Sequence, residues 1–547
     1  MGRYVNPGNE GFAKILRSRY VDKTGLISLF DTTLDTTEGL VMVSRPRRFG
    51  KSYAAQALAA FYSCGCDSRA LFEGLEVARR EGWDAHLNQY NVVKVDMTEV
   101  IEAAGSADVV PTLREVLLSD LRAMLPNASV RHVGKGSPLK DALWDVVEAT
   151  GRKFVFVIDE WDAPYRLTQD DAEAQDAYAE WLRALFKGLT FTPAVVAGAY
   201  MTGILPIKKY NHQSAVSDFW EYTMLDAAQY SPFVGFTDAD VEDLCEEYGM
   251  NLTDVRRWYD GYRLSYSEDL GVGARPRFRD REIDVYAPYS LMRACVRRRT
   301  GSYWPSTETF DSLREYIDMD FDGLQGAVLR AVAGEELRLD PMSFQNDITS
   351  LRSAADVLTL LVHLGYLAYE REDGTDVGRA RVPNEEVRLE LRRAIESSSH
   401  VEVARIVRDS IQLLHDLLAM DEEAVAAGIQ RAHDGTCAPQ FYNEEQALRA
   451  VVRAALIAAV DDWARIEELP SGYGLADVVF VPKRGSSKPA LLVELKWDKP
   501  VKGALDQIHD RDYPQILRDL DVPVLLVGIT YNAKSKKHVC RIEPLDR

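Results

Sequence analysis

The chain has 547 residues and a formal net charge of −20, with 46% hydrophobic, 27% charged and 10% aromatic residues. This length predicts two to four domains, because a single hydrophobic core stops growing well below it. The composition excludes a disordered chain and shows no uncharged apolar run of about 18 residues, so we expect a soluble protein without a membrane partner. The excess of acidic residues excludes non-specific binding of nucleic acid over the whole protein surface.

The N-terminal segment and the cysteines indicate the compartment. The first twenty residues lack the apolar core of a secretion signal, and the six cysteines are too scattered for a disulfide framework. We therefore expect a cytoplasmic protein with ordinary thiols.

Basic residues gather in three short runs despite the acidic total. They are Arg45 to Arg48, Val296 to Thr300 and Lys534 to His538. Most such runs are solvated faces, and only the first lies in a recognisable motif. The acidic total therefore does not exclude a local basic binding site.

Four Val-rich apolar runs in the first part of the chain predict buried parallel strands. They are 39–44, 91–97, 153–159 and 194–204. Amphipathic stretches separate them, which is typical of a sheet covered by helices. Residues 1–236 are therefore predicted to form a doubly wound α/β core.

The first of these strands leads into RPRRFGKS, Arg45 to Ser52. A helix that begins after Gly50 places amide groups and Lys51 at phosphate oxygens, while the Ser52 hydroxyl binds magnesium. The usual pattern has glycine five residues before Gly50, where this chain has Arg45. We predict a P-loop with an altered backbone path, the alternative being a basic turn after a strand.

The third strand ends in the acidic pair Asp159 and Glu160. Asp159 would hold magnesium and Glu160 would polarise the attacking water, the alternative being a simple strand cap. Thr202, at the end of the next strand, is either a γ-phosphate sensor or a satisfied strand-end hydroxyl. ATP or GTP binding is expected. The predicted nucleotide-binding residues are Arg45, Arg47, Arg48, Phe49, Gly50, Lys51, Ser52, Asp159 and Thr202.

The sequence pattern in the middle of the chain predicts mainly helices. Residues 237–305 are predicted to form a helical lid, with a helix that begins near Thr237 and ends at Gly249. Residues 306–435 are helical apart from two β-prone runs around 373–378, which predict a hairpin. Helices followed by a hairpin suggest a winged-helix-like region.

Strand patterns return in residues 436–547, which predict a second, smaller α/β domain. The expected strands are 475–481, 490–496 and 522–532, with a helix around 504–517.

Acidic and basic side chains meet on these predicted strands. Glu494 and Lys496 share one face, and a hairpin turning near residues 485–486 would place Asp477 opposite Glu494. Two carboxylates suit magnesium, which activates a water that Lys496 orients or helps to deprotonate. The alternative is a solvent-facing hairpin with salt bridges.

Flanking residues extend this cluster. Glu444 and Glu445 begin an amphipathic helix and offer a third acidic ligand, although a glutamate at a helix start also suits the helix dipole. Gln507 follows on the helix after the Glu494 strand.

Taken together, these segments resemble the bacterial AAA-ATPase-like proteins that carry a C-terminal PD-(D/E)XK nuclease domain. The resemblance covers nearly the whole chain and includes SRPRRFGKS, VIDEWDAP, TGILPI, WYDGY, VYAPYSL, VPNEEV, GYGLADVVF, LLVELK and ALDQIHDRDY. Arg45 in place of glycine is a mark of this family. The resemblance implies an AAA-like P-loop NTPase fold and a homo-oligomer through the ATPase domain.

The resemblance also implies roles for individual residues. Lys51, Ser52, Asp159 and Glu160 would form the ATPase site, and Asp477, Glu494, Lys496 and Gln507 the nuclease site. The upstream acidic ligand would be Glu445, with Glu444 and Glu468 as alternatives. The implied cofactors are ATP and Mg²⁺, with Mn²⁺ as the alternative nuclease metal.

Our leading hypothesis is an ATP-binding and ATP-hydrolysing protein whose nucleotide state gates a magnesium-dependent nuclease, with DNA as the favoured nucleic acid. The alternative is a nucleotide-controlled switch that binds nucleic acid or protein without cleavage. A role in defence or mobile elements rests on family analogy alone.

Overall fold

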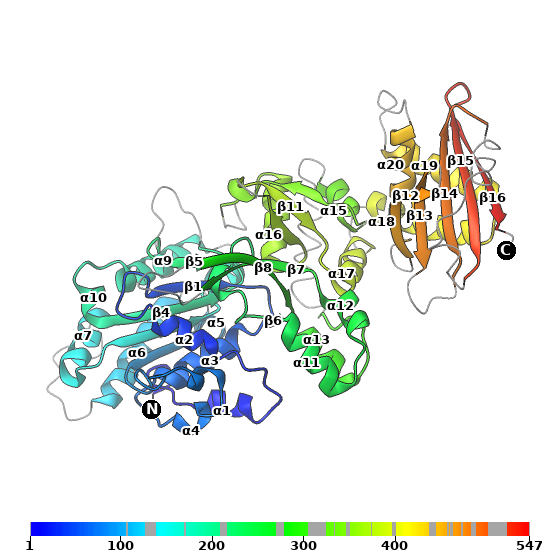
Figure 1. Cartoon of the computed structure of the whole chain (residues 1–547). Helices are drawn as coiled ribbons and strands as arrows, with labels where there is room; N and C mark the ends of the chain where they lie inside the picture. Colours follow the sequence, from blue (N-terminus) through cyan, green and yellow to red (C-terminus); the bar gives the residue numbers. More distant parts are fainter. Residues whose placement is uncertain are drawn as a thin grey trace. The chain divides into compact units, whose positions relative to one another are not determined.

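The structure is a computed structural model of the whole chain (Figure 1). It describes all residues except 1, 106–107, 126–137, 169–170, 208–215, 270–277, 305–323, 333, 346–350, 373–374, 397–400, 437–444, 457–458, 460–462, 472–473, 483–487, 501–521 and 546–547. Two compact units are present, Met1–Trp304 with Arg338–Val387, and Pro305–Leu337 with Arg388–Arg547. The expected middle region 306–435 is thus shared between the units, and the predicted domain boundaries stay predictions.

The first unit contains a five-stranded sheet in the order β2-β3-β4-β1-β5. Its strands are β1 (Leu40–Ser44), β2 (Asn91–Asp96), β3 (Phe154–Asp159), β4 (Val196–Gly203) and β5 (Trp220–Tyr222). All its pairs are parallel. The four predicted strands are confirmed. The short β5 was not predicted, because its three residues carry no apolar run.

Helices cover both faces of this sheet (Figure 1). They are α1 (Glu10–Leu16), α2 (Gly25–Asp31), α3 (Lys51–Tyr62), α4 (Arg69–Phe72), α5 (Met97–Ala104), α6 (Val109–Met124), α7 (Leu139–Thr150), α8 (Ala163–Leu167), α9 (Ala172–Phe186) and α10 (Phe191–Val195), with short 3₁₀ turns at Glu76–Arg79 and Ala228–Tyr230. An α/β core with a parallel sheet is therefore present.

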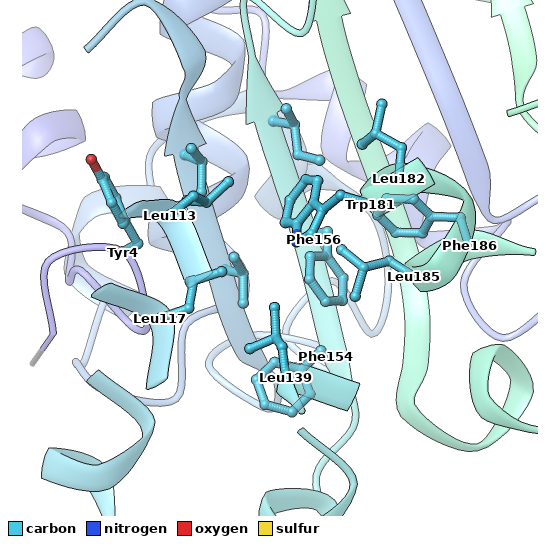
Figure 2. Packing of buried hydrophobic residues seen from close by; sticks show 14 of the residues in the cluster. Tyr4, Leu113, Leu117, Leu139, Phe154, Phe156, Trp181, Leu182, Leu185 and Phe186 are labelled. Carbon is cyan, nitrogen blue, oxygen red and sulfur yellow. The ribbon is translucent and has the colours of Figure 1, made fainter. Parts of the chain in front are cut away.

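The alternation of β3 assigns its residues to these two faces. Phe154 and Phe156 pack with Leu117 of α6 and Leu185 of α9 in one core (Figure 2). Helix α3 contacts β2, β3 and β4. Because successive strand residues point to opposite faces, Asp159 lies on the side away from the Phe156 core, the side of α3.

After the core, the chain forms β6 (Phe236–Thr237), α11 (Asp238–Tyr248), α12 (Leu252–Tyr259), β7 (Tyr262–Asp269), β8 (Phe278–Tyr286) and α13 (Pro288–Arg297). The expected start and end of α11 are confirmed by a capping box at Thr237 and by Gly249, whose φ is 66°.

In the predicted helical lid 237–305, helices α11, α12 and α13 are present, and β6, β8 and β7 form a sheet that was not predicted. In β7, Tyr262, Leu264 and Tyr266 alternate with polar residues, which is the pattern of a strand with one buried face. The antiparallel pairing of β7 with β8 is accompanied by cross-strand ion pairs, as between Arg263 and Asp284, where Nε and Oδ1 lie 3.3 Å apart.

The predicted hairpin around 373–378 is confirmed. Strand β10 (Ala368–Arg371) pairs antiparallel with β11 (Gly378–Arg381). This hairpin follows helix α16 (Ala354–Leu364) and precedes α17 (Glu385–Glu396). A third strand, β9 (Leu337–Leu339), completes the sheet, and a 3₁₀ turn spans Pro341–Ser343.

The second unit contains a sheet in the order β12-β13-β14-β15-β16. Its elements are α15 (Leu324–Val332), α18 (Val401–Leu418), α19 (Glu422–Thr436), α20 (Glu445–Ala455), β12 (Trp463–Ser471), β13 (Gly474–Pro482), β14 (Ala490–Trp497), β15 (Val524–Asn532) and β16 (Lys537–Pro544). The three predicted strands are confirmed as β13, β14 and β15. The edge strands β12 and β16 were not predicted, and the helix expected at 504–517 lies outside the described residues.

Helices and sheet of this unit share a core. Leu417 of α18 and Leu448 of α20 belong to one buried cluster with Val478 of β13 and Val493 of β14. In the part of the chain that the structure describes, no helix is both long and apolar enough to cross a bilayer.

Candidate functional site

The junction between β1 and α3 forms a loop with an open helix start. Strand β1 ends at Ser44, and α3 begins at Lys51. Gly50 precedes α3 with a φ of 94°, which only glycine adopts without strain, and no side chain caps the helix. The first amide groups of a helix lack partners within it, so this end can bind an anion.

Lys51 is buried at this helix start, with 4% of its surface exposed. Its Nζ donates to the carbonyl oxygens of Arg45 and Pro46, each at 3.1 Å. The same atom lies 3.5 Å from Oε1 of Glu160. The ammonium therefore lies within the loop, next to the acidic end of β3.

Arg45, which stands where a P-loop usually has glycine, is completely buried. Its Nη1 donates to the carbonyl oxygens of Ser44 at 2.8 Å and Thr223 at 3.2 Å. Nε and Nη2 have no hydrogen-bond partner among the described residues. Burial lowers the pKa of Arg45 to about 10. This guanidinium thus ties the loop to the segment that follows β5.

The next loop residues contact the elements that follow the core. Phe49 is fully buried and meets Tyr262 of β7 edge to face, with ring centroids 5.4 Å apart. Arg48 has a φ of 69° and lies over the ring of Tyr289 of α13, 4.1 Å from its centroid. Arg47 is half-buried. The loop is therefore packed against β7 and α13.

Asp159 is the last residue of β3 and is almost fully buried. Burial raises its pKa to about 6, although the nearby Ser52 hydroxyl and the charge of Lys51 act in the opposite direction. The magnesium role of Ser52 and Asp159 stays a prediction. Among these residues, Ser52 is the exposed one.

Glu160 follows with a φ of 50°, a left-handed conformation that is costly for a residue other than glycine. Its carboxylate pairs with Lys51 and with Arg166. Burial acts to raise the pKa of Glu160, but the charges of Lys51, Arg166 and Arg47 outweigh it and hold that pKa below its ordinary value. Glu160 is thus ionised at neutral pH.

Arg166 was not predicted from the sequence. It lies in α8, contacts Glu160, and donates from Nε to Oδ2 of Asp162 at 2.9 Å. Asp162 also accepts from the backbone N–H groups of Ile204 at 3.2 Å and Leu205 at 2.9 Å. These contacts fix Glu160 relative to the end of β4. The i, i+4 spacing of Asp162 and Arg166 was the available signal.

Thr202 lies in β4 on the face that carries Asp159. Its neighbour Met201 belongs to the opposite core, so alternation turns Thr202 toward α3. The Thr202 side chain is completely buried, and its Oγ1 has no hydrogen-bond partner within the described residues. The hydrogen bond that would satisfy the Thr202 hydroxyl at the end of a strand is therefore absent among the described residues.

A second cluster lies on β13 and β14. Val478 pairs with Val493, so Asp477 stands opposite Glu494, as the hairpin register predicted. Asp477, Glu494 and Lys496 are 7%, 2% and 9% exposed. Lys496 Nζ lies 3.1 Å from Oε1 of Glu494, and the backbone N–H of Leu495 donates to Oδ2 of Asp477 at 2.8 Å. A solvent-facing hairpin does not fit this burial.

Arg449 of α20 completes the cluster and was not predicted. Its Nη2 donates to Oδ1 of Asp477 at 2.6 Å. Helix α20 begins at Glu445, one turn before Arg449. Gln507 and Glu444 lie outside the described residues, as do the side chains of Glu445 and Glu468.

Metal binding at this second cluster stays a prediction. Within the described ranges, no group of three His, Cys, Asp or Glu side chains is placed to hold a metal ion. Asp477 and Glu494 supply two buried carboxylates, the oxygen ligands that suit Mg²⁺. The donor chemistry of these two carboxylates fits the cation.

Residues 8–211 match the family described as "Predicted AAA-ATPase". An uncharacterised protein from the vnfD 5′ region of Azotobacter chroococcum is 23% identical over 97% of both chains. Among solved structures, a Walker-type ATPase of Pyrococcus abyssi is 11% identical with a TM-score of 0.33, over 68% of this chain and 94% of its own. The ORC2 protein of Aeropyrum pernix in its ADP form is 12% identical with a TM-score of 0.27, over 69% and 93%. Residues 8–211 of this chain are therefore similar to predicted AAA-ATPases.

Proposed function

We propose that the chain hydrolyses ATP at the loop between β1 and α3, and that its nucleotide state controls a magnesium-dependent nuclease in the second unit. Nucleic acid, with DNA favoured, is the proposed substrate. One observation carries the proposal: each unit holds a buried lysine paired with a glutamate, Lys51 with Glu160 and Lys496 with Glu494. Buried charges are costly, and both pairs lie beside a further buried aspartate.

In the ATPase site, the start of α3 and Lys51 would hold the phosphates. Phosphate oxygens would replace the carbonyl oxygens of Arg45 and Pro46 as acceptors for Nζ of Lys51. Ser52 and Asp159 would hold Mg²⁺, which neutralises charge on the transferring phosphoryl group.

Glu160 would act as the general base for the attacking water. It is ionised at neutral pH because its pKa lies below the ordinary value. Arg166 keeps its carboxylate in place when Lys51 turns to phosphate. Thr202 offers an unpartnered hydroxyl on the same face, which suits contact with the terminal phosphate.

In the nuclease site, Asp477 and Glu494 would hold Mg²⁺ or Mn²⁺, with Glu445 favoured over Glu444 and Glu468 as the third ligand. A metal held there lowers the pKa of its bound water. Lys496 would orient that water, and Gln507 would assist. Arg449 must leave Oδ1 of Asp477 before a metal can bind at that oxygen.

A second candidate function is a nucleotide-controlled switch that binds nucleic acid or protein without cutting. The ion pairs favour it, because Arg449 already neutralises Asp477 and Lys496 already neutralises Glu494. The winged-helix-like region around β10 and β11 would then carry recognition.

A cleavage assay separates the two functions. The purified full chain is incubated with linear, circular and single-stranded DNA and with RNA, with and without Mg²⁺ and ATP. We expect magnesium-dependent cleavage product from the wild type and no product from Lys496→Ala. The control variant is Lys499→Ala, which should cut like the wild type because Lys499 is exposed and lies beyond the end of β14. Absence of product from the wild type in every condition favours the switch, and cleavage by Lys496→Ala contradicts the assigned site.

A further inference from the structure

Tyr289 of α13 joins two basic runs that are far apart in the sequence. Arg48 of the phosphate loop lies 4.1 Å from the centroid of the Tyr289 ring, and Arg293 lies 5.2 Å from it. The run that begins at Arg45 and the run that ends at Thr300 therefore form one surface.

This surface continues along α13. Arg293 and Arg297 are four residues apart, so they lie on one face of the helix, about 6 Å along its axis. Arg297 lies 5.3 Å from the ring centroid of Tyr303. We use the term arginine surface for the exposed side chains of Arg48, Arg293, Arg297, Arg298 and Arg299.

Within the part of the chain that the structure describes, the arginine surface has no acidic partner. Among the described residues, none of its five arginines forms an ion pair with a carboxylate. Other exposed arginines of the same unit do, such as Arg19 with Glu247 and Arg69 with Asp84. In a chain with 85 acidic and 65 basic residues, an unpaired row of positive charge is selective for a polyanion.

We propose that the arginine surface binds the phosphate backbone of nucleic acid beside the nucleotide site. A guanidinium group can donate two parallel hydrogen bonds to the oxygens of one phosphate. A row of positive charges along one helix face suits a linear polymer of phosphates better than a folded acidic protein. The inference rests on the proposed nucleic-acid substrate, but it concerns the first unit and requires no cleavage.

The surface also adjoins the ATP-binding loop. Arg48 is two residues from Gly50, and its left-handed backbone keeps it against Tyr289. A phosphate that reorganises this loop therefore acts on the arginine surface as well. By linkage, nucleic acid and ATP change each other's affinity by the same factor.

Binding is measured by fluorescence anisotropy with the full chain and labelled double- and single-stranded DNA. EDTA is present so that neither cleavage nor ATP hydrolysis contributes, and salt is varied. The test variant is Arg293→Gln/Arg297→Gln/Arg299→Gln. The matched control removes three exposed arginines elsewhere in the unit, as Arg17→Gln/Arg79→Gln/Arg80→Gln.

We expect the test variant to raise Kd for DNA at least tenfold and to reduce the slope of log K against log salt by about 2 to 3, with the control near the wild type. Melting temperatures equal to the wild type exclude misfolding. An equal rise in Kd for DNA in the test variant and in the control variant overturns the proposal. Binding of acidic peptides but not of DNA by the wild type overturns it as well. If DNA binds as expected and no condition gives cleavage, the nuclease proposal fails and this one stands.

Discussion

Lys51 and Glu160 form an ion pair at the carboxyl end of the parallel sheet, with Nζ and Oε1 3.5 Å apart. The lysine begins α3 and the glutamate follows β3, so the pair joins the phosphate-binding end of the site to its acidic end. Phosphate would compete with Glu160 for the same ammonium group. Under the proposed function, binding of ATP would therefore release Glu160 to act as the general base.

Lys51→Ala tests the phosphate contact. Losing hydrogen bonds from a charged group costs about 1.5 to 3 kcal/mol, which predicts a 10- to 100-fold rise in Kd for ATP. Titration calorimetry with Mg-ATP measures it. Lys153→Ala is the control, since Lys153 pairs with Asp35 at the surface. Equal affinities in Lys51→Ala and wild type would contradict the assigned role.

Arg166 is predicted to position Glu160 through its ion pair. Arg166→Ala should lower kcat for ATP about 10- to 100-fold with little change in KM, and Arg166→Lys should recover part of the loss. The alanine variant should also show a raised pKa for Glu160, because one of the charges that lower it is gone. Steady-state hydrolysis from pH 5 to 9 checks this. A fall in stability without any change in the pH profile would make Arg166 merely structural.

Asp159 should make nucleotide binding depend on pH. Its pKa is raised to about 6, and only its ionised form holds magnesium, so affinity for Mg-ATP should rise as pH increases through 6. Calorimetric titrations between pH 5 and 8 measure this dependence, with ATP in the absence of magnesium as the control. A flat profile would contradict the raised pKa.

The same shift predicts a stability effect. The folded pKa lies above the unfolded value near 3.8, so ionising Asp159 lowers stability: the penalty is absent below pH 4, grows between 4 and 6, and is full above 6. It amounts to roughly 3 kcal/mol. Asp159→Asn should therefore melt above the wild type at pH 7.5 and equal to it at pH 4. Thermal melts without nucleotide decide this, and a lower melting point at pH 7.5 would count against it.

Arg449 should compete with metal for Asp477. Arg449→Gln breaks a buried ion pair, which costs about 3 to 5 kcal/mol without metal. Because Oδ1 of Asp477 is then free, Mg²⁺ or Mn²⁺ should raise the melting temperature more in this variant than in the wild type. Arg453→Gln, one turn further along α20, is the control. Equal metal-induced shifts in all three proteins would refute the competition.

The sequence predicted those parts of the fold where burial leaves a clear pattern. The Val-rich strands β1 to β4 and β13 to β15 are buried on both faces, and Gly50 marks the start of α3. The register of β13 and β14, in which Val478 pairs with Val493 next to Asp477 and Glu494, followed from counting residues on each side of a turn.

The missed features differ in their cause. In β7, Tyr262, Leu264 and Tyr266 alternate with polar residues, a strand pattern that was overlooked between the helical stretches on either side. Arg166 and Arg449 reach their carboxylates only after folding, and Arg449 lies 28 residues from Asp477 in the chain. Arg45 was predicted to touch nucleotide, while its described contacts are backbone carbonyl oxygens. A role in nucleotide binding stays a prediction for it.

The rate of DNA cleavage with Mg²⁺, measured with and without ATP, tests the central claim most directly. We expect ATP to change the rate several-fold in the wild type, Lys51→Ala to cut without responding to ATP, and Lys496→Ala to hydrolyse ATP without cutting. Cleavage by Lys496→Ala, or a wild-type rate that ATP leaves unchanged, would contradict a nucleotide-gated nuclease.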